Sequence, residues 1–259
     1  MEKFTKKVFV LNKKEGETPL GCLGRFRSKN KSYLGVKMTY AGRLDPMASG
    51  LMLVLAGEET KNKEKYLGLD KEYEFEILFG FSTDTYDILG KVQHSHILKN
   101  IGMLELRELE KTIKSNLKYF RGKFTQKYPI YSSKTVKGKQ LFQYARGSVD
   151  VEVPSREINV KKLQFIKLRK INNKKLLTNI EKRIRKIKGD FRQKEILKIW
   201  HQKLNTKTPQ QFSIGSFKIK CGSGTYVRGI ANSLGEKIDL PTLAFSIKRT
   251  KIGKFGKIQ

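Results

Sequence analysis

The sequence predicts an α+β fold, in which strands and helices share one body without regular alternation. Several short segments have the apolar runs or two-residue alternation of strands, whereas others have the apolar spacing of helices. The two kinds are mixed along the chain without a strict strand–helix–strand order, and no internal repeat is visible. At 259 residues the chain can bury a sizeable core, as one large domain or two small ones.

The first half of the chain contains three predicted strands and three predicted helices. Residues 51–55 form an almost unbroken apolar run, typical of a buried strand, and 73–79 alternates, with Tyr73 on its apolar face. Apolar residues recur at helical spacing over 104–120, whereas 81–90 reads as a polar loop. In order, the elements are a strand at 8–11, a helix at 19–26, a strand at 51–55, a short helix at 58–67, a strand at 73–79 and a helix at 104–120.

The second half is dominated by a long basic segment between two alternating strands, expected at 158–168 and 212–220. Over 169–207 there are 14 Lys and Arg residues against three Asp and Glu, and apolar residues repeat every three or four positions. We interpret this segment as a basic helical hairpin with one apolar stripe on the body, used either as a phosphate clamp or as a surface elaboration without a specific role. The other elements are a short helix around 141–145, a glycine turn and helical stripe over 221–234, and a Gly-Lys-rich strand within 240–258.

The net charge of the chain points to a polyanionic partner. Lys and Arg total 55 against 24 Asp and Glu, a formal charge of +31. A hydrophobic content of 38% excludes a disordered basic tail, and no stretch approaches the roughly 20 apolar residues of a membrane span. The N-terminus does not resemble a signal peptide. A cytoplasmic nucleic-acid-binding protein is the expectation, with a generally lysine-rich proteome as the alternative.

Cysteine and histidine usage supports neither a metal site nor a disulfide. Cys22 and Cys221 are isolated and far apart, and the chain contains three His residues and no CxxC motif. We therefore predict no bound metal.

Asp45 is the best candidate for an active-site residue. It lies in the segment GRLDP, between Arg43 and Pro46, directly ahead of the apolar run at 51–55. A buried strand at this place would hold the turn, and its carboxylate, against a rigid wall. The alternative is a turn aspartate that caps its own backbone.

A second candidate surface is the segment 121–153, in which basic and aromatic residues are interleaved. Such a mixture suits backbone phosphates and unstacked bases. The alternative is a solvated basic loop whose aromatic side chains belong to the core. The basic residues are Lys134, Lys137, Lys139 and Arg146, and the aromatic residues are Tyr128, Tyr131, Phe142 and Tyr144.

Four segments together resemble the TruB-type pseudouridine synthases. They occur in the family's order and cover most of the chain outside 169–212. The segments are GRLDPMASGLMLVLAGEETK (42–61), KEYEFEILFGFSTDTYDILG (71–90), YPIYSSKTVKGKQLFQYAR (128–146) and CGSGTYVRGIANSLGEKI (221–238).

The resemblance implies the pseudouridine-synthase catalytic fold, with a central mixed, mainly antiparallel sheet flanked by helices. It implies a single catalytic domain over 1–259, in which 121–153 closes over the RNA. The basic segment 169–212 is then a helical-hairpin insertion, and few residues remain after Ile247 for a C-terminal PUA domain. The expected partner is the T-arm stem-loop of tRNA, bound by a monomer.

The implied reaction is the isomerisation of a uridine to pseudouridine, at position 55 in the T-loop of tRNA, without a cofactor. The base must be flipped out of the folded loop to be reached. Asp45 matches the family's invariant carboxylate, which acts on the ribose or on the base, and Arg228 matches the arginine that pairs with it. Tyr73 matches the tyrosine that stacks on the uracil, and Tyr226 and Ile247 would wall the pocket.

Further site residues are implied less directly. Asp84 and Asp87 match a family segment in which one Asp supports base flipping, and both could equally be turn caps. Lys13 and Lys61 match lysines near the site, with either a structural role or a phosphate contact. Tyr40 stands where the family usually has His, a residue associated with rearrangement on substrate binding.

Two other functions compete with the isomerase. A non-catalytic RNA chaperone on the same fold would explain the charge and the degenerate opening motif LNKKEGETPL. A glycosidase-like hydrolase could use Asp45 with Asp84 or Asp87, but it gives no reason for the charge of +31.

Overall fold

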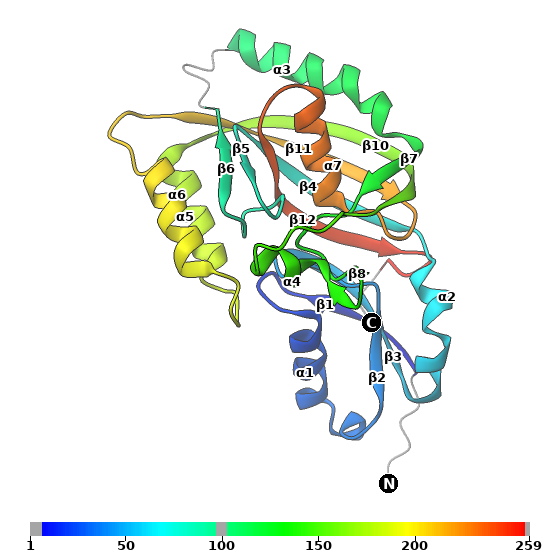
Figure 1. The fold of residues 1–259 in the computed structure, drawn as a ribbon. Coiled ribbons are helices and arrows are strands. Elements are labelled where there is room, and N and C mark those ends of the chain that lie inside the picture. Colours follow the sequence, from blue (N-terminus) through cyan, green and yellow to red (C-terminus); the bar gives the residue numbers. More distant parts are fainter. Residues whose placement is uncertain (1–6, 97–102, 257–259) are drawn as a thin grey trace.

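A mixed β-sheet forms the frame of the protein (Figure 1). The computed structural model describes residues 7–96 and 103–256, and eight strands of these residues join the sheet in the order β1-β3-β12-β4-β11-β10-β7, with β2 paired to β3. The β12–β3 pair is parallel and the other pairs in this sheet are antiparallel, which confirms the predicted class. The strands are β1 (Val8–Lys13), β2 (Met38–Ala41), β3 (Ala48–Ala56), β4 (Lys71–Phe79), β7 (Gly122–Lys127), β10 (Ser155–Asn172), β11 (Gln211–Cys221) and β12 (Thr242–Ile252).

The α-helices lie around this frame, and two small hairpins, β5–β6 and β8–β9, stand outside it. The helices are α1 (Pro19–Lys29), α2 (Lys63–Leu67), α3 (Met103–Asn116), α4 (Leu141–Arg146), α5 (Asn173–Ile184), α6 (Gln193–Leu204) and α7 (Val227–Lys237). The hairpin strands are β5 (Phe81–Thr83), β6 (Val92–Ser95), β8 (Thr135–Val136) and β9 (Lys139–Gln140). Among the described residues, no helix is both long and apolar enough to cross a membrane.

One face of the sheet packs against α3 and α7. Two large core clusters of buried side chains lie on the two sides of the sheet. The alternation in β4 places Phe75 and Ile77 in the cluster beneath α3 and α7, and Leu78 in the cluster on the other side. From α7, Ile230 and Leu234 join the first cluster, because the helical stripe read from the sequence faces the sheet. This packing places the first turn of α7 beside the turn that precedes β3.

The basic hairpin α5–α6 packs on the other cluster. Its stripe residues Ile180 and Trp200 are fully buried, and the Trp200 ring meets the ring of Phe81 edge-on at 5.1 Å. Leu78 and Phe212 from the sheet belong to the same cluster. The predicted hairpin is therefore present and completes the core. Its helices span 173–204, a shorter range than predicted, because β10 and β11 extend toward them from both sides.

The segment 81–90 differs from the predicted polar loop. It begins as β5 and is largely buried, although half of its ten residues are Ser, Thr or Asp. The burial is possible because the polar groups satisfy one another: Thr83 donates to the carbonyl of Asp87 (2.6 Å), and Thr85 donates to its carboxylate (2.8 Å). The last strand also differs, since β12 ends at Ile252, before most of the Gly-Lys-rich tail, and 257–258 lie outside the described residues.

Candidate active site

Asp45 lies in the turn that leads into β3. Leu44 and Met47 are both buried, one in each of the two large core clusters, so the turn is anchored on both sides of the carboxylate. The Asp45 side chain is 39% exposed and lines a cavity of about 930 Å³. No backbone N–H of the described residues donates to this carboxylate, and the geometry is therefore not that of a capping aspartate.

Arg228, in the first turn of α7, holds the Asp45 carboxylate from within the protein. Its Nε donates to Asp45 Oδ2 at 2.8 Å, while its other nitrogens donate to the carbonyls of Thr85 (2.8 Å) and Tyr131 (2.9 Å). Burial opposes the charge of this guanidinium, but the Asp45 and Asp87 carboxylates outweigh it and raise the pKa of Arg228. The arginine is therefore a fixed cation that orients one oxygen of Asp45.

Aromatic and apolar side chains form the walls around this pair. Tyr73 on β4 and Ile247 on the adjacent β12 line the cavity, and Tyr40 on β2 also lines it. Burial raises the pKa of Tyr73, so that its phenol stays protonated at neutral pH. Tyr226 meets Tyr128 of the 121–153 segment edge-on at 5.7 Å. Flat walls of this kind can hold a planar base.

Two buried cations beneath the cavity are not among the residues that the sequence indicated. Arg249 is 1% exposed and donates to the carbonyls of Leu51 (2.6 Å) and Gly42 (3.1 Å), which ties β12 to the turn around Asp45. Lys71 lines the cavity, and burial together with the Arg249 charge lowers its pKa to about 8. Lys71 opens the family-like segment 71–90, which was the available sequence signal for it, whereas a lone Arg in a strand carries none.

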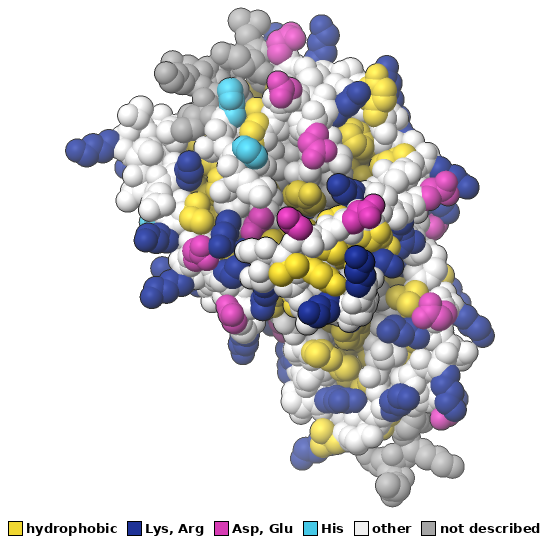
Figure 2. Space-filling view, in the orientation of Figure 1, with side chains coloured by type: hydrophobic (Ala, Val, Ile, Leu, Met, Phe, Trp, Pro, Cys, Tyr) yellow, Lys and Arg dark blue, Asp and Glu magenta, His cyan; other side chains and the backbone are white. Residues whose placement is uncertain are grey.

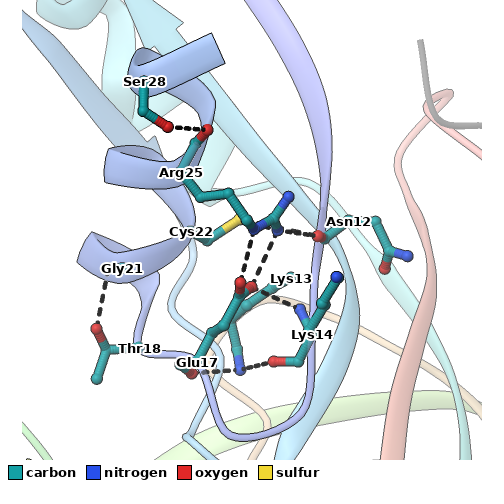
Figure 3. A network of polar contacts seen from close by, with 9 residues as sticks. All are labelled: Asn12, Lys13, Lys14, Glu17, Thr18, Gly21, Cys22, Arg25 and Ser28. Carbon is teal, nitrogen blue, oxygen red and sulfur yellow. Dashed lines mark hydrogen bonds and ion pairs between the residues drawn. The ribbon is translucent and has the colours of Figure 1, made fainter. Parts of the chain in front are cut away.

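Lys13 supports the site without lining the cavity. Figure 3 shows its ammonium group bonded to Lys14 and Glu17, beside Arg25 of α1. Its Nζ is fully buried and donates to the carbonyls of Glu17 (2.7 Å), Lys14 (3.0 Å) and Pro46 (3.4 Å). Burial lowers its pKa to about 8, although Glu17 and Asp45 oppose this shift. Arg25 of α1 clamps the Glu17 carboxylate at 2.6 Å, which fixes the loop. Lys13 thus steadies the residue that follows Asp45.

The two aspartates of 81–90 have different places. Asp84 does not line the cavity; it accepts the backbone N–H of Lys91 and pairs with Arg192 at 2.7 Å. Asp87 lines the cavity but is 6% exposed and accepts the N–H of Leu89. Burial raises the pKa of Asp87 to about 6, against the opposing charge of Arg228. Asp87 therefore caps a turn, whereas Asp84 joins the two ends of the segment, and each also has a charged neighbour.

The structure does not bring all the predicted basic residues to the cavity. Lys61 is exposed and pairs with Glu58, away from the lining. Lys134 lies over the ring of Tyr128 at 5.6 Å, and Lys137 and Lys139 are exposed on the β8–β9 hairpin. Of this set, Arg146 on α4 lines the cavity.

The α5–α6 hairpin reaches the site at two places that the sequence did not indicate. Arg192, at the start of α6, lines the cavity mouth. Arg183 of α5 forms a bidentate pair with Glu15, Nη2 to Oε2 at 2.7 Å and Nε to Oε1 at 3.1 Å, in the loop behind the Asp45 turn. The Gly16 amide in this loop donates to the carbonyl of Pro46 at 2.9 Å. The hairpin therefore contacts both sides of the candidate site.

Comparisons with known proteins first define the class of fold. A solved structure titled "Crystal Structure of a Cbf5-Nop10-Gar1 Complex" superposes on 97% of this chain and 50% of its own, with a TM-score of 0.54 at 17% identity, a likeness in fold. Residues 29–189 match the model of the TruB family pseudouridylate synthase (N terminal domain). This match covers more than half of the chain, which therefore belongs to the TruB family.

Named relatives agree with this assignment. The chain is 32% identical over 219 residues to "tRNA pseudouridine synthase B" of Caldanaerobacter subterraneus, which covers 85% of this chain and 60% of the relative. It is 30% identical over 219 residues to the protein of the same name from Caldicellulosiruptor saccharolyticus, covering 85% of this chain and 59% of the relative. The chain thus spans about 60% of the length of these relatives.

Proposed function

We propose that this chain converts a uridine of tRNA to pseudouridine, with Asp45 as the catalytic carboxylate. One observation carries the proposal: Asp45 is open to a cavity, while a buried arginine, Arg228, holds one of its oxygens at 2.8 Å. A carboxylate oriented by a fixed cation inside a pocket is poised for attack on a bound sugar or base. The TruB family match and the named relatives support the same reaction.

The geometry suggests a role for each wall of the pocket. A uridine flipped out of the T-loop would enter the cavity and stack against Tyr73, with Ile247 and Tyr226 closing the sides. Its N-glycosidic bond breaks, the uracil turns, and a bond forms from C5 to the ribose. The C5 proton then leaves to solvent and N1 takes up a proton, so that the product is an isomer of the uridine. Asp45 attacks the ribose or the base, and both routes use the same carboxylate, which Arg228 holds in place through one of its oxygens.

Tritium release from C5-labelled uridine in a T-arm stem-loop RNA tests the proposal. The wild-type chain should release tritium and Asp45→Asn should not, because the amide cannot act as a nucleophile or base. Asp70→Asn is the matched control, since Asp70 pairs with Lys161 and does not line the cavity. Equal release by wild type and Asp45→Asn would contradict the role of Asp45, and free uracil among the products would indicate a hydrolase.

We also propose that the exposed lysines of α5 and α6 bind tRNA phosphates. Dark blue side chains gather over this hairpin at the left of Figure 2, and the two helices expose a run of them. Each neutralised phosphate steepens the salt dependence of binding. Deleting the hairpin would uncover the core around Trp200, and exchanging the lysines for Gln is therefore the sharper test. The set is Lys174, Lys175, Lys182, Lys194, Lys198 and Lys203.

These exchanges should weaken tRNA binding and flatten its salt slope while the fold is kept. An unchanged slope would contradict the phosphate contact.

The remaining parts of the proposal are that 121–153 closes over the RNA, that the T-loop uridine is the target, and that a monomer acts in the cytoplasm. Mapping of pseudouridines in tRNA exposed to the protein tests the target, and sedimentation tests the monomer.

A further inference from the structure

Arg192 reaches from the tip of the α5–α6 hairpin to the mouth of the candidate site. Its Nη1 donates to Asp84 Oδ2 and to the Tyr131 hydroxyl, both at 2.7 Å. Its guanidinium also lies over the ring of Tyr131, 4.3 Å from the ring centre. The side chains of Arg192 and Asp84 are only 18% and 15% exposed. One arginine therefore binds two segments that are distant in the sequence.

Both of these segments also hold Arg228. The carbonyl of Tyr131 accepts from Arg228 Nη2 at 2.9 Å, and the carbonyl of Thr85, the neighbour of Asp84, accepts from Nη1 at 2.8 Å. The third contact of the guanidinium of Arg228 is the Asp45 carboxylate. The side chain of Arg192 thus binds side chains of the same two segments whose main-chain carbonyls hold the guanidinium of Arg228.

A second contact keeps the hairpin tip in this place. Arg146 of α4 donates to the carbonyl of Asp190 at 2.9 Å, and the Asp190 carboxylate accepts the N–H of Arg192 at 3.1 Å. Arg192 itself has φ +63° and ψ +24°, a left-handed conformation that is uncommon outside glycine. The tip is therefore set in a specific shape against the 121–153 segment.

We propose that Arg192 is a positioning residue for the Arg228–Asp45 pair. The inference rests on the proposed function, but it concerns Arg192, which lies beyond the end of the family match at residue 189. Arg192 acts through Tyr131 and Asp84 and does not touch the reacting atoms. In this chain the basic hairpin completes the catalytic site in addition to carrying charge.

A direct phosphate contact is the competing role for Arg192. The Asp84 carboxylate already neutralises its charge, and Tyr131 covers one face of its guanidinium. An arginine that waits for a phosphate would be left open to solvent, as are Lys194 and Lys198 on the same helix. The two roles predict different kinetics, because loss of a phosphate contact raises KM, whereas loss of positioning lowers kcat.

The test compares Arg192→Ala with Lys194→Ala in the tritium-release assay. Arg192→Ala should lower kcat roughly 10- to 100-fold with little change in KM, as expected when catalytic groups lose their alignment. Lys194→Ala removes the same charge without contacting Asp84 or Tyr131, and should change KM only. A raised KM with an unchanged kcat for Arg192→Ala would overturn the proposal.

Amide hydrogen exchange gives a second readout that needs no activity. In Arg192→Ala, residues 84–90 and 128–133 should exchange faster than in the wild type, while the exchange of α7 outside its first turn stays slow. Unchanged exchange in both segments would overturn the proposal even if the proposed reaction were wrong. Should Arg192→Ala not fold, Tyr131→Phe removes only the hydroxyl that accepts from Arg192, and a kcat equal to wild type would count against positioning.

Discussion

Replacing Arg228 by methionine removes the buried cation of the candidate site while keeping a side chain of similar length. The arginine is 2% exposed and makes three hydrogen bonds, one to Asp45 and two to main-chain carbonyls. Methionine can make none of them. The carbonyls of Thr85 and Tyr131 then lose their donor, and Asp45 loses the group that orients it.

The size of the effect follows from the burial of each partner. An orphaned buried carbonyl costs about 1–3 kcal/mol, whereas the ion pair contributes only about 1 kcal/mol, because Asp45 is 39% exposed. The apolar methionine offsets part of this loss in stability, because burying the charged guanidinium itself costs free energy. We expect a net loss of roughly 3 kcal/mol in unfolding free energy, or about 6–12 °C in Tm.

Thermal unfolding measures the stability change, and tritium release well below both melting temperatures measures the rate, which should fall at least about 100-fold. Arg228→Lys keeps the charge but cannot serve three acceptors, and should recover stability more than rate. Arg121→Met is the control, since it breaks one bond, to the carbonyl of Leu163. A variant Arg228→Met with wild-type rate would refute the reasoning.

Three further outcomes are expected. Gly50→Ala should lower stability by about 2–4 kcal/mol in thermal unfolding, because its Cβ would lie 2.2 Å from the Arg249 carbonyl at φ +104°; a wild-type Tm would contradict this. Lys13→Met should lower the free energy of unfolding in urea by about 1–3 kcal/mol, because the carbonyls of Lys14, Glu17 and Pro46 lose their donor. An unchanged free energy of unfolding would contradict this. The pKa of Asp87 is raised to about 6 in the folded state, which therefore binds a proton more readily than the unfolded chain. Relative to Asp87→Asn, the wild type should gain roughly 2 kcal/mol in unfolding free energy as pH falls from 7 to 4, and parallel pH curves would exclude this.

The sheet and the packing faces could be predicted because their signals are local. The run at 51–55 appears as β3, which is buried on both faces. The alternation at 73–79 appears as β4, in which the exposed Glu74 and the half-buried Glu76 share a face with the buried Leu78. The stripe through the basic segment predicted a hairpin on the body, which α5 and α6 form. The prediction of a polar loop at 81–90 was wrong, because the polar groups of this segment hydrogen-bond to one another and can therefore be buried. The pattern of polar and apolar residues along the chain does not show such pairing.

The candidate site could be predicted only in part. Asp45, Arg228 and Tyr73 came from motif segments, and the fold brings all three to one cavity. Lys61 matched a motif equally well, yet it lies away from the lining and pairs with Glu58. A motif match therefore indicates a place in the chain and does not determine which way a side chain points.

By itself the sequence determined the fold class, the family resemblance and the basic charge, since periodicity, ordered motifs and composition are properties of the chain alone. Only the tertiary structure decided which cations besides Arg228 serve the site, and how Lys13 does so. Lys13, Arg249 and Arg192 derive their roles from carbonyls, a carboxylate and a ring supplied by distant segments. Such roles depend on distances of about 3 Å between residues far apart in the sequence, and these distances exist only once the core has packed.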